Sequence, residues 1–173
     1  MAAIVLLTAA QAEMEIDDLA DILWDCVDGG ASVNFVKPFT HEEARGFWRR
    51  TIASMAAGGT VMLGARHEGR LAGTVLLGID TPPNQPHRAD IKKLLVHRRA
   101  RRLGLAKALM AAAEAEARRR GRQLLTLDTQ CGSAAERLYH DLGYTLLGII
   151  PRYAVAPDGG TVDDCAFFYK ALA

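Results

Sequence analysis

The turn at residues 101–106, Arg-Arg-Leu-Gly-Leu-Ala, is the feature that most constrains the fold, because it joins a strand-like run to a helix-like run. Residues 91–96 before it are apolar and partly β-branched, as expected of a largely buried strand. Leu105, Leu109 and Ala113 after it recur at helical spacing. The first N–H groups of a helix lack internal partners, and the helix dipole makes that end positive. The segment therefore predicts a phosphate-binding turn between a strand and a helix.

The basic run at residues 98–102, Arg-Arg-Ala-Arg-Arg, has two simpler interpretations, a solvated surface turn and a nucleic-acid-binding patch. The strand before the run and the helix after it favour phosphate binding over a plain surface turn. A formal net charge of +1 argues against the broad basic face that nucleic acid requires. A second basic cluster at residues 118–122 lies where cations stabilise a helix C-terminus, so we interpret it as structural. We expect no nucleic-acid partner.

Length and composition favour one well-packed domain over residues 1–173, since half of the 173 residues are hydrophobic and no linker divides them. The apolar start at residues 1–8 lacks a basic segment before it, so we interpret it as a strand rather than a signal peptide. No run is long and apolar enough to cross a membrane. The three cysteines, Cys26, Cys131 and Cys165, show neither a disulfide framework nor paired metal-ligand spacing. We therefore expect a cytoplasmic protein with no metal and no membrane partner.

The order of the remaining segments predicts a mixed α/β (α+β) fold. About four helices are expected, at residues 12–28, 40–57, 105–120 and 133–142. About seven strands are expected, at residues 1–8, 60–67, 71–79, 88–96, 123–129, 144–150 and 164–172. Thr40 and Glu43 match a capping box at the start of the second helix. The central sheet is expected to be mixed, with an antiparallel meander followed by a βαβ crossover and a final hairpin.

This order of elements resembles the GCN5-related N-acetyltransferase (GNAT) superfamily over nearly the whole chain. The acetyl-CoA signature of that family, Gln/Arg-x-x-Gly-x-Gly/Ala, is matched by Arg101, Gly104 and Ala106. A second signature, a tyrosine followed four residues later by Gly-Phe or Gly-Tyr, is matched by Tyr139 and residues 143–144. The resemblance implies a GNAT fold, with acetyl-CoA as the cosubstrate.

A closer resemblance is to the tabtoxin resistance protein branch, through stretches within residues 29–33, 93–96, 127–129, 132–133 and 153–159. Those proteins acetylate a β-lactam amino-acid toxin. The resemblance therefore implies direct transfer of an acetyl group to the amine of a small molecule, such as an amino-acid-like toxin or antibiotic. A protein N-terminal or lysine acetyltransferase and a non-catalytic CoA-binding regulator are the alternatives. A monomer and a homodimer both fit the sequence.

The resemblance also implies which residues bind acetyl-CoA. The strand backbone would hold the pantetheine arm like an added strand, and the turn would bind the phosphates. The residues expected to do so are Leu94, Leu95, Val96, Arg101, Arg102, Leu103, Gly104, Leu105, Ala106 and Lys107. Two positions depart from the family pattern, with Arg102 where glycine is frequent and Arg98 where proline is frequent. Neither change removes a backbone N–H, so the expectation of phosphate binding stands.

Acetyl transfer to an amine requires a base for the ammonium and a proton donor for the departing thiolate. In the family pattern the hydroxyl of Tyr139 points at the CoA sulfur, and a phenol with a pKa near ~10 is a competent donor. The other interpretation of Tyr139 is a helix residue that packs its ring in the core. Cys131 offers an acetyl-cysteine route, but no histidine is placed by sequence to activate it.

Two acids in otherwise apolar strands, Asp90 and Asp128, are the candidate bases. If their strands are parallel neighbours that separate around the thioester, as the family implies, both carboxylates would face the cleft. There they would bind a cationic amine and, directly or through water, take its proton. The alternatives are an acid at a loop edge for Asp90, and a turn cap together with Thr129 for Asp128.

The acceptor site is expected outside the strand, turn and helix that bind the cosubstrate. Ser32 and Asn34, which lie close to two glycines, and the loop residue Tyr153 are the predicted substrate-binding residues. Phe47 and Trp48 lie on the second predicted helix and are more typical of a core.

Overall fold

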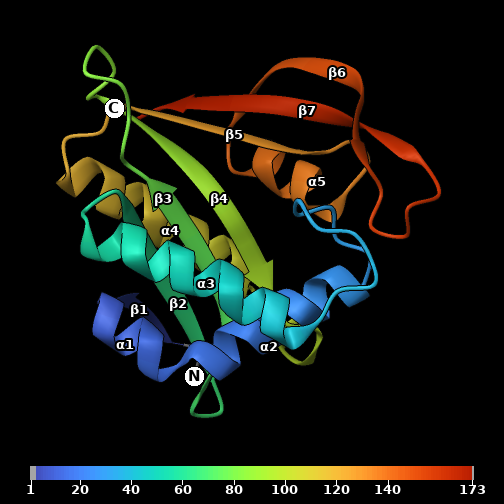
Figure 1. The fold of residues 1–173 in the computed structure, drawn as a ribbon. Coiled ribbons are helices and arrows are strands. Elements are labelled where there is room, and N and C mark those ends of the chain that lie inside the picture. The colour runs from blue at the N-terminus through green and yellow to red at the C-terminus, as the bar shows by residue number, and fades with distance from the viewer. Residues whose placement is uncertain (1–2, 173) are drawn as a thin grey trace.

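The computed structural model describes residues 3–172 and confirms the mixed α/β fold (Figure 1). Within these residues the seven strands are Ala3–Leu7 (β1), Thr60–His67 (β2), Arg70–Gly78 (β3), Arg88–Val96 (β4), Leu124–Gln130 (β5), Thr145–Val155 (β6) and Val162–Ala171 (β7). The same residues form five α-helices and one 3-10 helix: Ala9–Met14 (α1), Ile16–Asp28 (α2), His41–Ala56 (α3), Arg98–Ala100 (η1, 3-10), Leu105–Arg119 (α4) and Ala134–Asp141 (α5). Residues 1 and 2 of the predicted first strand, and residue 173 of the predicted domain, lie outside the described residues.

The strands of the described chain form one sheet in the order β1-β2-β3-β4-β5-β7-β6. β1 to β4 pair antiparallel, as predicted for the meander. β4 and β5 pair parallel, because the chain crosses over between them through α4. β7 then pairs with β5 and leaves β6 at the edge of the sheet. The hairpin between β2 and β3 turns at Glu68 and Gly69, which both have positive φ, the geometry that suits a tight hairpin.

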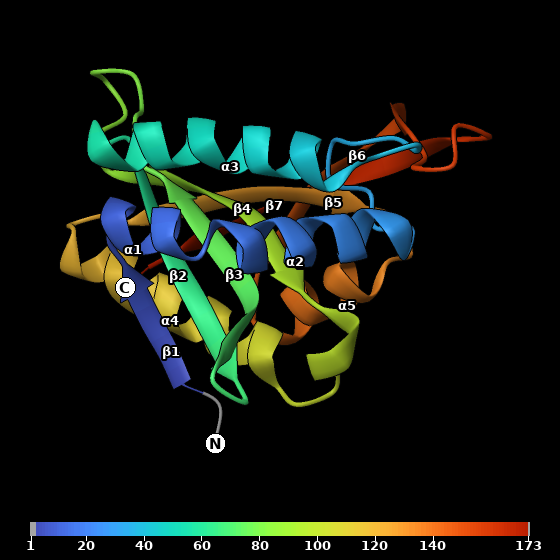
Figure 2. The same ribbon diagram turned by 60° about the horizontal axis from the view of Figure 1, so that its bottom comes forward.

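Helices cover both faces of the sheet (Figure 2). Alternate residues of a strand point to opposite faces, so β2 contributes Val61 to one core and Met62 to the other. The first core packs against α4 and α5, for example through Leu109. The second packs against α1, α2 and α3, where Trp48 is fully buried as predicted. Of the helices in residues 3–172, none has the length and apolar character that a membrane span requires.

The single helix predicted over residues 12–28 was wrong, since two helices, α1 and α2, occupy this region. Thr8 forms a capping box that starts α1 earlier than predicted. Glu15 separates the helices with a backbone at φ −107° and ψ 21°, and its carboxylate pairs with Arg66 of β2. The described chain therefore has five α-helices rather than about four. α3 begins as predicted, with a capping box at Thr40.

The pairing of β4 with β5 is short, and this shapes the rest of the molecule. It joins only residues 88–90 to residues 124–126, and the strands separate beyond that point. β4 also carries a β-bulge, because its register against β3 shifts between Lys92 and Leu95. Lys93 lies within the bulge and has a φ of 50°. The separated ends of the two strands form one wall of the site described next.

Candidate functional site

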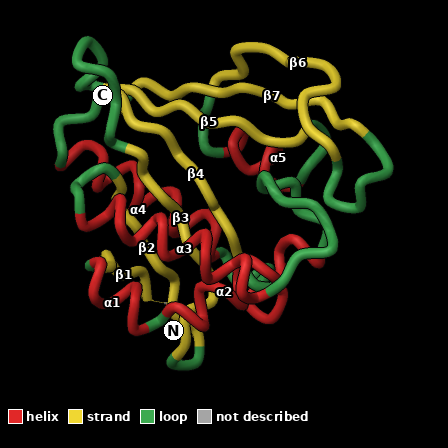
Figure 3. Tube along the Cα trace, in the orientation of Figure 1, coloured by secondary structure: helices red, strands yellow, loops and turns green. Residues whose placement is uncertain are grey.

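A cleft of about 1200 Å³ lies where β4 and β5 separate. It is lined by the second half of β4, the turn before α4, the end of β5, α5, residues 29–36 and parts of β6 and β7. The loop after α2 runs from the helical layer toward the turn between β6 and β7 (Figure 3). The backbone N–H of Lys37 in this loop donates to the carbonyl oxygen of Pro157 in that turn at 2.7 Å. The loop and the turn are therefore joined directly beside the cleft.

The predicted pantetheine-binding residues, Leu94, Leu95 and Val96, all line the cleft. β3 pairs with one edge of β4 here, whereas β5 has already left the other edge. The Leu95 side chain is buried, so this residue can offer only its backbone to a ligand. The carbonyl oxygen of Val96 accepts a hydrogen bond from Nε of Arg101 at 3.2 Å. A strand edge of this kind can pair with an extended, amide-containing ligand.

The turn before α4 has the geometry expected of an anion-binding site. Gly104 is the N-cap residue with a φ of 76°, no side chain caps the helix, and its first turn carries no acid. The first N–H groups of α4 therefore lack side-chain partners. Arg102 also has a positive φ, 63°, which explains why glycine suits this position in the family pattern.

The predicted cofactor-binding residues of the turn divide into three groups. Arg101 and Ala106 line the cleft. The side chain of Leu105 packs in the first core instead. The other predicted residues do not line the cleft, namely Arg102, Leu103, Gly104 and Lys107. Their predicted role depends on the backbone N–H groups around the start of α4.

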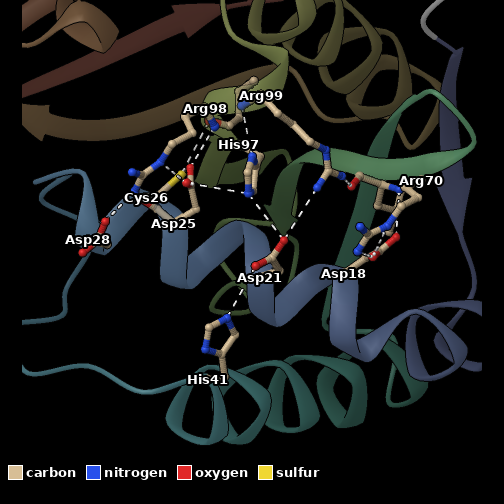
Figure 4. Close-up of polar contacts among 12 residues, drawn as sticks. Asp18, Asp21, Asp25, Cys26, Asp28, His41, Arg70, His97, Arg98 and Arg99 are labelled. Carbon is tan, nitrogen blue, oxygen red and sulfur yellow. Dashed lines mark hydrogen bonds and ion pairs between the residues drawn. The ribbon is translucent and has the colours of Figure 1, made fainter.

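Three aspartates on one side of α2, Asp21, Asp25 and Asp28, hold this turn in place (Figure 4). Asp25 is only 2% exposed; it accepts the backbone N–H of Arg98 at 2.8 Å and pairs with the Arg98 guanidinium. Asp28 accepts from the same guanidinium at 2.6 Å, and Asp21 lies 3.6 Å from the guanidinium of Arg99. A proline at position 98 would lack the N–H that Asp25 accepts. The departure from the family pattern at this position thus has a structural role.

Arg101 extends from the turn into the cleft. Its guanidinium lies 3.8 Å from the Asp25 carboxylate and is 46% exposed, so it keeps donors for an anionic ligand. Nε2 of His97 lies 3.6 Å from Asp25, and burial lowers the pKa of His97, so the ring is neutral near pH 7. The positive charge of the turn therefore comes from its arginines.

Tyr139 of α5 lines the cleft and is 5% exposed. Its ring packs in the core, with centroids 5.8 Å from Tyr144 and 6.0 Å from Phe168. Its hydroxyl makes no hydrogen bond within residues 3–172. Burial, and to a smaller degree Asp128, raises the pKa of Tyr139 far above its usual range, so the phenol stays protonated at ordinary pH. The two interpretations of this residue are therefore compatible.

The two predicted bases occupy different places, because the paired part of β4 and β5 ends between them. Asp128 lies beyond the paired part and lines the cleft, where it accepts from the thiol of Cys165 at 3.5 Å. Asp90 lies inside the paired part, and Arg88 and Thr126 both donate to its carboxylate. Asp90 does not line the cleft, so the expectation that both carboxylates face it is not met.

Cys26 lines the cleft, but burial raises the pKa of its thiol. Cys131 and Cys165 are not prepared to act as nucleophiles either. Cys131 does not line the cleft, and burial together with Glu136 raises the pKa of its thiol. Cys165 lines the cleft, but burial and Asp128 raise its pKa to about 12. The reactive form of cysteine is the thiolate, so all three residues stay inert at neutral pH. Across residues 3–172 no group of three or more His, Cys, Asp or Glu side chains could hold a metal ion.

The three predicted acceptor contacts, Ser32, Asn34 and Tyr153, all line the cleft, so the structure brings them together. Ser32 and Asn34 belong to the loop after α2. Tyr153 was predicted in a loop, which was wrong, because β6 continues to Val155 and includes it. Tyr153 is 51% exposed and packs edge-on against Phe167, with ring centroids 5.3 Å apart. Phe47, predicted as a core residue, packs partly against the second core and also lines the cleft.

Lys93 also lines the cleft, although it was not among the predicted site residues. Its Nζ donates to Oδ1 of Asn34 at 3.0 Å. Burial lowers the pKa of Lys93 to about 8, partly opposed by the nearby charge of Asp128. The only signal in the sequence was a pair of lysines inside an otherwise apolar strand.

Comparison with known proteins identifies the family. A profile of the acetyltransferase (GNAT) family matches residues 16–144, which include α2 to α5. An N-acetyltransferase from Staphylococcus aureus Mu50 is similar over 100% of this chain and 99% of its own, with a TM-score of 0.82 and 20% identity. YncA from Salmonella typhimurium, solved with its cofactor acetyl-CoA, is similar over 100% of this chain and 95% of its own, with a TM-score of 0.78 and 20% identity.

A ribosomal-protein-alanine N-acetyltransferase from Brucella melitensis is similar over 98% of this chain and 99% of its own, with a TM-score of 0.75 and 24% identity. At these identities the three solved structures share the fold with this chain. The profile match covers α2, α3, the strands β2 to β4, the turn before α4 and Tyr139. On that match, the chain belongs to the acetyltransferase (GNAT) family.

Proposed function

We propose that this chain is an acetyl-CoA-dependent N-acetyltransferase that passes an acetyl group directly to the amine of a small molecule. The catalytic domain would span residues 1–173 and act in the cytoplasm. The observation that carries the proposal is one continuous cleft. It runs from the turn before α4, along the unpaired edge of β4, to the loop after α2, with Tyr139 and Asp128 on its wall.

Two features of the cleft fit acetyl-CoA. The uncapped start of α4 and the guanidinium of Arg101 offer N–H donors to phosphate groups. The edge of β4 at residues 94–96 is not occupied by β5, so the peptide groups that face this edge can pair with the amides of a pantetheine arm; among them the Val96 carbonyl also accepts from Arg101. The bound cosubstrate supplies the acetyl thioester.

The side chains on the cleft wall suit direct transfer. Asp128 offers a counter-charge that binds the acceptor ammonium. Tyr139 donates its hydroxyl toward the departing sulfur, and its raised pKa keeps that proton in place at every working pH. Complete proton transfer to a thiolate of pKa near ~8.5 is uphill for such a phenol. We therefore assign Tyr139 a hydrogen bond that strengthens as charge develops on sulfur.

A small acceptor is favoured because protein bounds the acceptor end of the cleft on two sides. The loop after α2 lies on one side and β6 with its following turn on the other, and the Lys37–Pro157 hydrogen bond joins them. A long polypeptide crossing the cleft would have to pass segments that this bond holds together. Ser32, Asn34 and Tyr153 would contact the acceptor. An amino-acid-like toxin or antibiotic is the acceptor class that we propose.

The test is a thiol-release assay with acetyl-CoA and a panel of amines: amino acids and amino-acid-like toxins, aminoglycosides, polyamines, and peptides with free N-termini or lysines. The proposal expects amine-dependent release of CoA with a small member of the panel. Release of CoA only with peptides would indicate that the acceptor is a protein rather than a small molecule. Tight binding of acetyl-CoA without release for any amine would point to a non-catalytic regulator.

A further inference from the structure

Lys93 lies at the point where the strand geometry of β4 is broken. Its φ of 50° falls in the left-handed region, which non-glycine residues seldom adopt. Thr74 of β3, fully buried, donates its hydroxyl to the carbonyl oxygen of Lys93 at 3.1 Å. This bond holds the bulge in one conformation, and a bulge redirects the side chain that it carries. The side chain of Lys93 lines the cleft.

The amine of Lys93 is surrounded by neutral groups rather than by a salt bridge. Nζ donates to the amide oxygen of Asn34 at 3.0 Å. It also lies 5.8 Å from the ring centroid of Phe35 and 5.3 Å from that of Phe47. No carboxylate within the described part of the chain forms an ion pair with it. The loop after α2 and α3 therefore desolvate the amine without neutralising it.

Two charged residues act on this amine from the strands. Asp128 on β5 favours the ammonium form, and Lys92 on β4 disfavours it. Burial outweighs both and lowers the pKa of Lys93 to about 8. A substantial fraction of Lys93 is thus a neutral amine near pH 8. Such an amine can donate to Asn34 and still keep its lone pair free.

We propose that Lys93 takes the proton from the ammonium of the acceptor, a role that rests on the proposed function above. The acceptor R–NH₃⁺ gives one proton to Nζ, and its freed lone pair forms the C–N bond as the C–S bond breaks. The sulfur departs as a thiolate that accepts a hydrogen bond from the Tyr139 hydroxyl, and it then takes the second proton, which the new amide nitrogen loses. Lys93 then releases its proton to solvent, so that one proton is produced for each acetyl group transferred.

The main competing role for Lys93 is to hold an anionic group of the acceptor by its charge. Arginine separates the two roles, because its guanidinium keeps the charge and cannot be deprotonated in this pH range. A merely structural role would appear as lost cosubstrate binding or a lost cooperative unfolding transition. Lys92, an exposed neighbour on the same strand that also lines the cleft, provides a matched control.

The experiment measures kcat/KM between pH 6 and pH 10 for the wild type, Lys93→Met, Lys93→Arg and Lys92→Met, using the panel amine that is acetylated fastest. In both Lys93→Met and Lys93→Arg, kcat/KM at pH 8 should fall about 100-fold. The change of slope near pH 8 in the plot of kcat/KM against pH, the break, should also disappear. Both should bind acetyl-CoA within about twofold of the wild type and unfold cooperatively. Lys92→Met should keep its rate, with the break moved to a slightly higher pH.

A fourth variant tests the direction of the effect. Asn34→Asp places a carboxylate next to Nζ, so it should move the break to a higher pH without abolishing it. Lys93→Arg with activity within about threefold of the wild type, or an unchanged break in Lys93→Met, would overturn the proton-acceptor role while leaving the acetyltransferase intact. Failure of every amine to release CoA in the wild type would instead reject the proposed function, and this role with it.

Discussion

At the end of the cleft where we propose that phosphate binds, the phosphate end, ion pairs to α2 hold the turn before α4. At the end where we propose that the acceptor binds, the acceptor end, aromatic packing and neutral hydrogen bonds hold the loop after α2. Asp25 accepts both the backbone N–H and the guanidinium of Arg98. At the other end, Phe35 packs 5.5 Å from Phe47, and Asn34 is bonded to Lys93. The ion pairs fix the position of the first end, and its backbone N–H donors can bind any phosphate group. The second end combines few fixed charges with aromatic walls, as a site that selects its ligand by shape would.

The two ends also differ in how they use their chain segments. The phosphate end is one contiguous turn whose donors are mostly backbone N–H groups. The acceptor end gathers single side chains from the loop after α2, α3, β4 and β6. We therefore expect substitutions at the phosphate end to lower stability and cosubstrate binding, and substitutions at the acceptor end to change turnover without lowering stability. The five predictions that follow test this division, in order of decreasing effect.

Tyr139→Phe should lower kcat about 100-fold, the size expected when a group that hydrogen-bonds the departing atom is lost. The ring stays in its core position, so the Kd for acetyl-CoA should change by less than about twofold. Turnover is followed by thiol release and binding by calorimetry. Wild-type turnover in this variant would remove Tyr139 from the chemistry and leave it a core residue only.

Asp25→Ala should lower the free energy of unfolding by about 2–3 kcal/mol. The substitution removes a carboxylate that is 2% exposed, so the Arg98 guanidinium keeps only its ion pair with Asp28. The turn should loosen, and the affinity for acetyl-CoA should fall with it. Urea denaturation measures the first effect and calorimetry the second. Asp17→Ala is the matched control on α2, since Asp17 is 77% exposed and its loss should cost about 0.5 kcal/mol or less. Equal losses in the two variants would contradict the role of Asp25.

Arg101→Met should raise the Kd for acetyl-CoA about tenfold, the effect of losing one or two charge-assisted hydrogen bonds to phosphate. Arg102→Met should raise it only about twofold, because the Arg102 side chain does not line the cleft. Calorimetry at low and high salt measures both, and the Arg101 effect should shrink as salt rises. A larger loss in Arg102→Met would mean that the other arginine is the phosphate ligand.

Asp128→Asn should lower kcat/KM for the acceptor about tenfold, because the ammonium loses its counter-charge in the cleft. Asp90→Asn should change kcat/KM by no more than about twofold, since Arg88 and Thr126 hold Asp90 at the closed end of the two strands. The comparison uses steady-state kinetics on the same acceptor. An equal loss of kcat/KM in the two variants would make Asp90 a candidate base again.

Lys93→Met should raise the stability of the protein by about 1–2 kcal/mol at pH 7. Burial lowers the pKa of Lys93 from 10.5 to about 8, so the folded state binds fewer protons than the unfolded state between these values. The cost of the buried ammonium is therefore complete below pH 8 and disappears as the pH rises above 10.5. Urea denaturation at pH 7 and at pH 10.5 should show the gain at the lower pH only. An equal gain at both would mean that packing, not charge, is responsible.

Much of the fold and part of the candidate site could be predicted because their signals are local. The capping box at Thr40 and the turn with Arg101, Gly104 and Ala106 are short patterns whose physics does not depend on distant residues. The family resemblance added Tyr139, and the structure places it in the cleft.

The missed features depend on how distant segments pair. Asp90 and Asp128 look alike in sequence, and only the end of the parallel pairing decides which one the cleft receives. Lys93 enters the cleft through a bulge whose position is set by the register of β4 against β3. The break at Glu15 between α1 and α2 accompanies an ion pair to Arg66 on another strand.

We propose that one cleft binds acetyl-CoA at the turn before α4 and that the acetyl group is transferred to a small amine at the other end. Counting the products tests this proposal most directly. Free CoA and N-acetylated amine are measured in the same reaction, for the wild type beside Tyr139→Phe. We predict one CoA for each acetylated amine, with release that requires the amine and falls about 100-fold in the variant. Release of CoA that is independent of the amine, or equal in the two proteins, would contradict it.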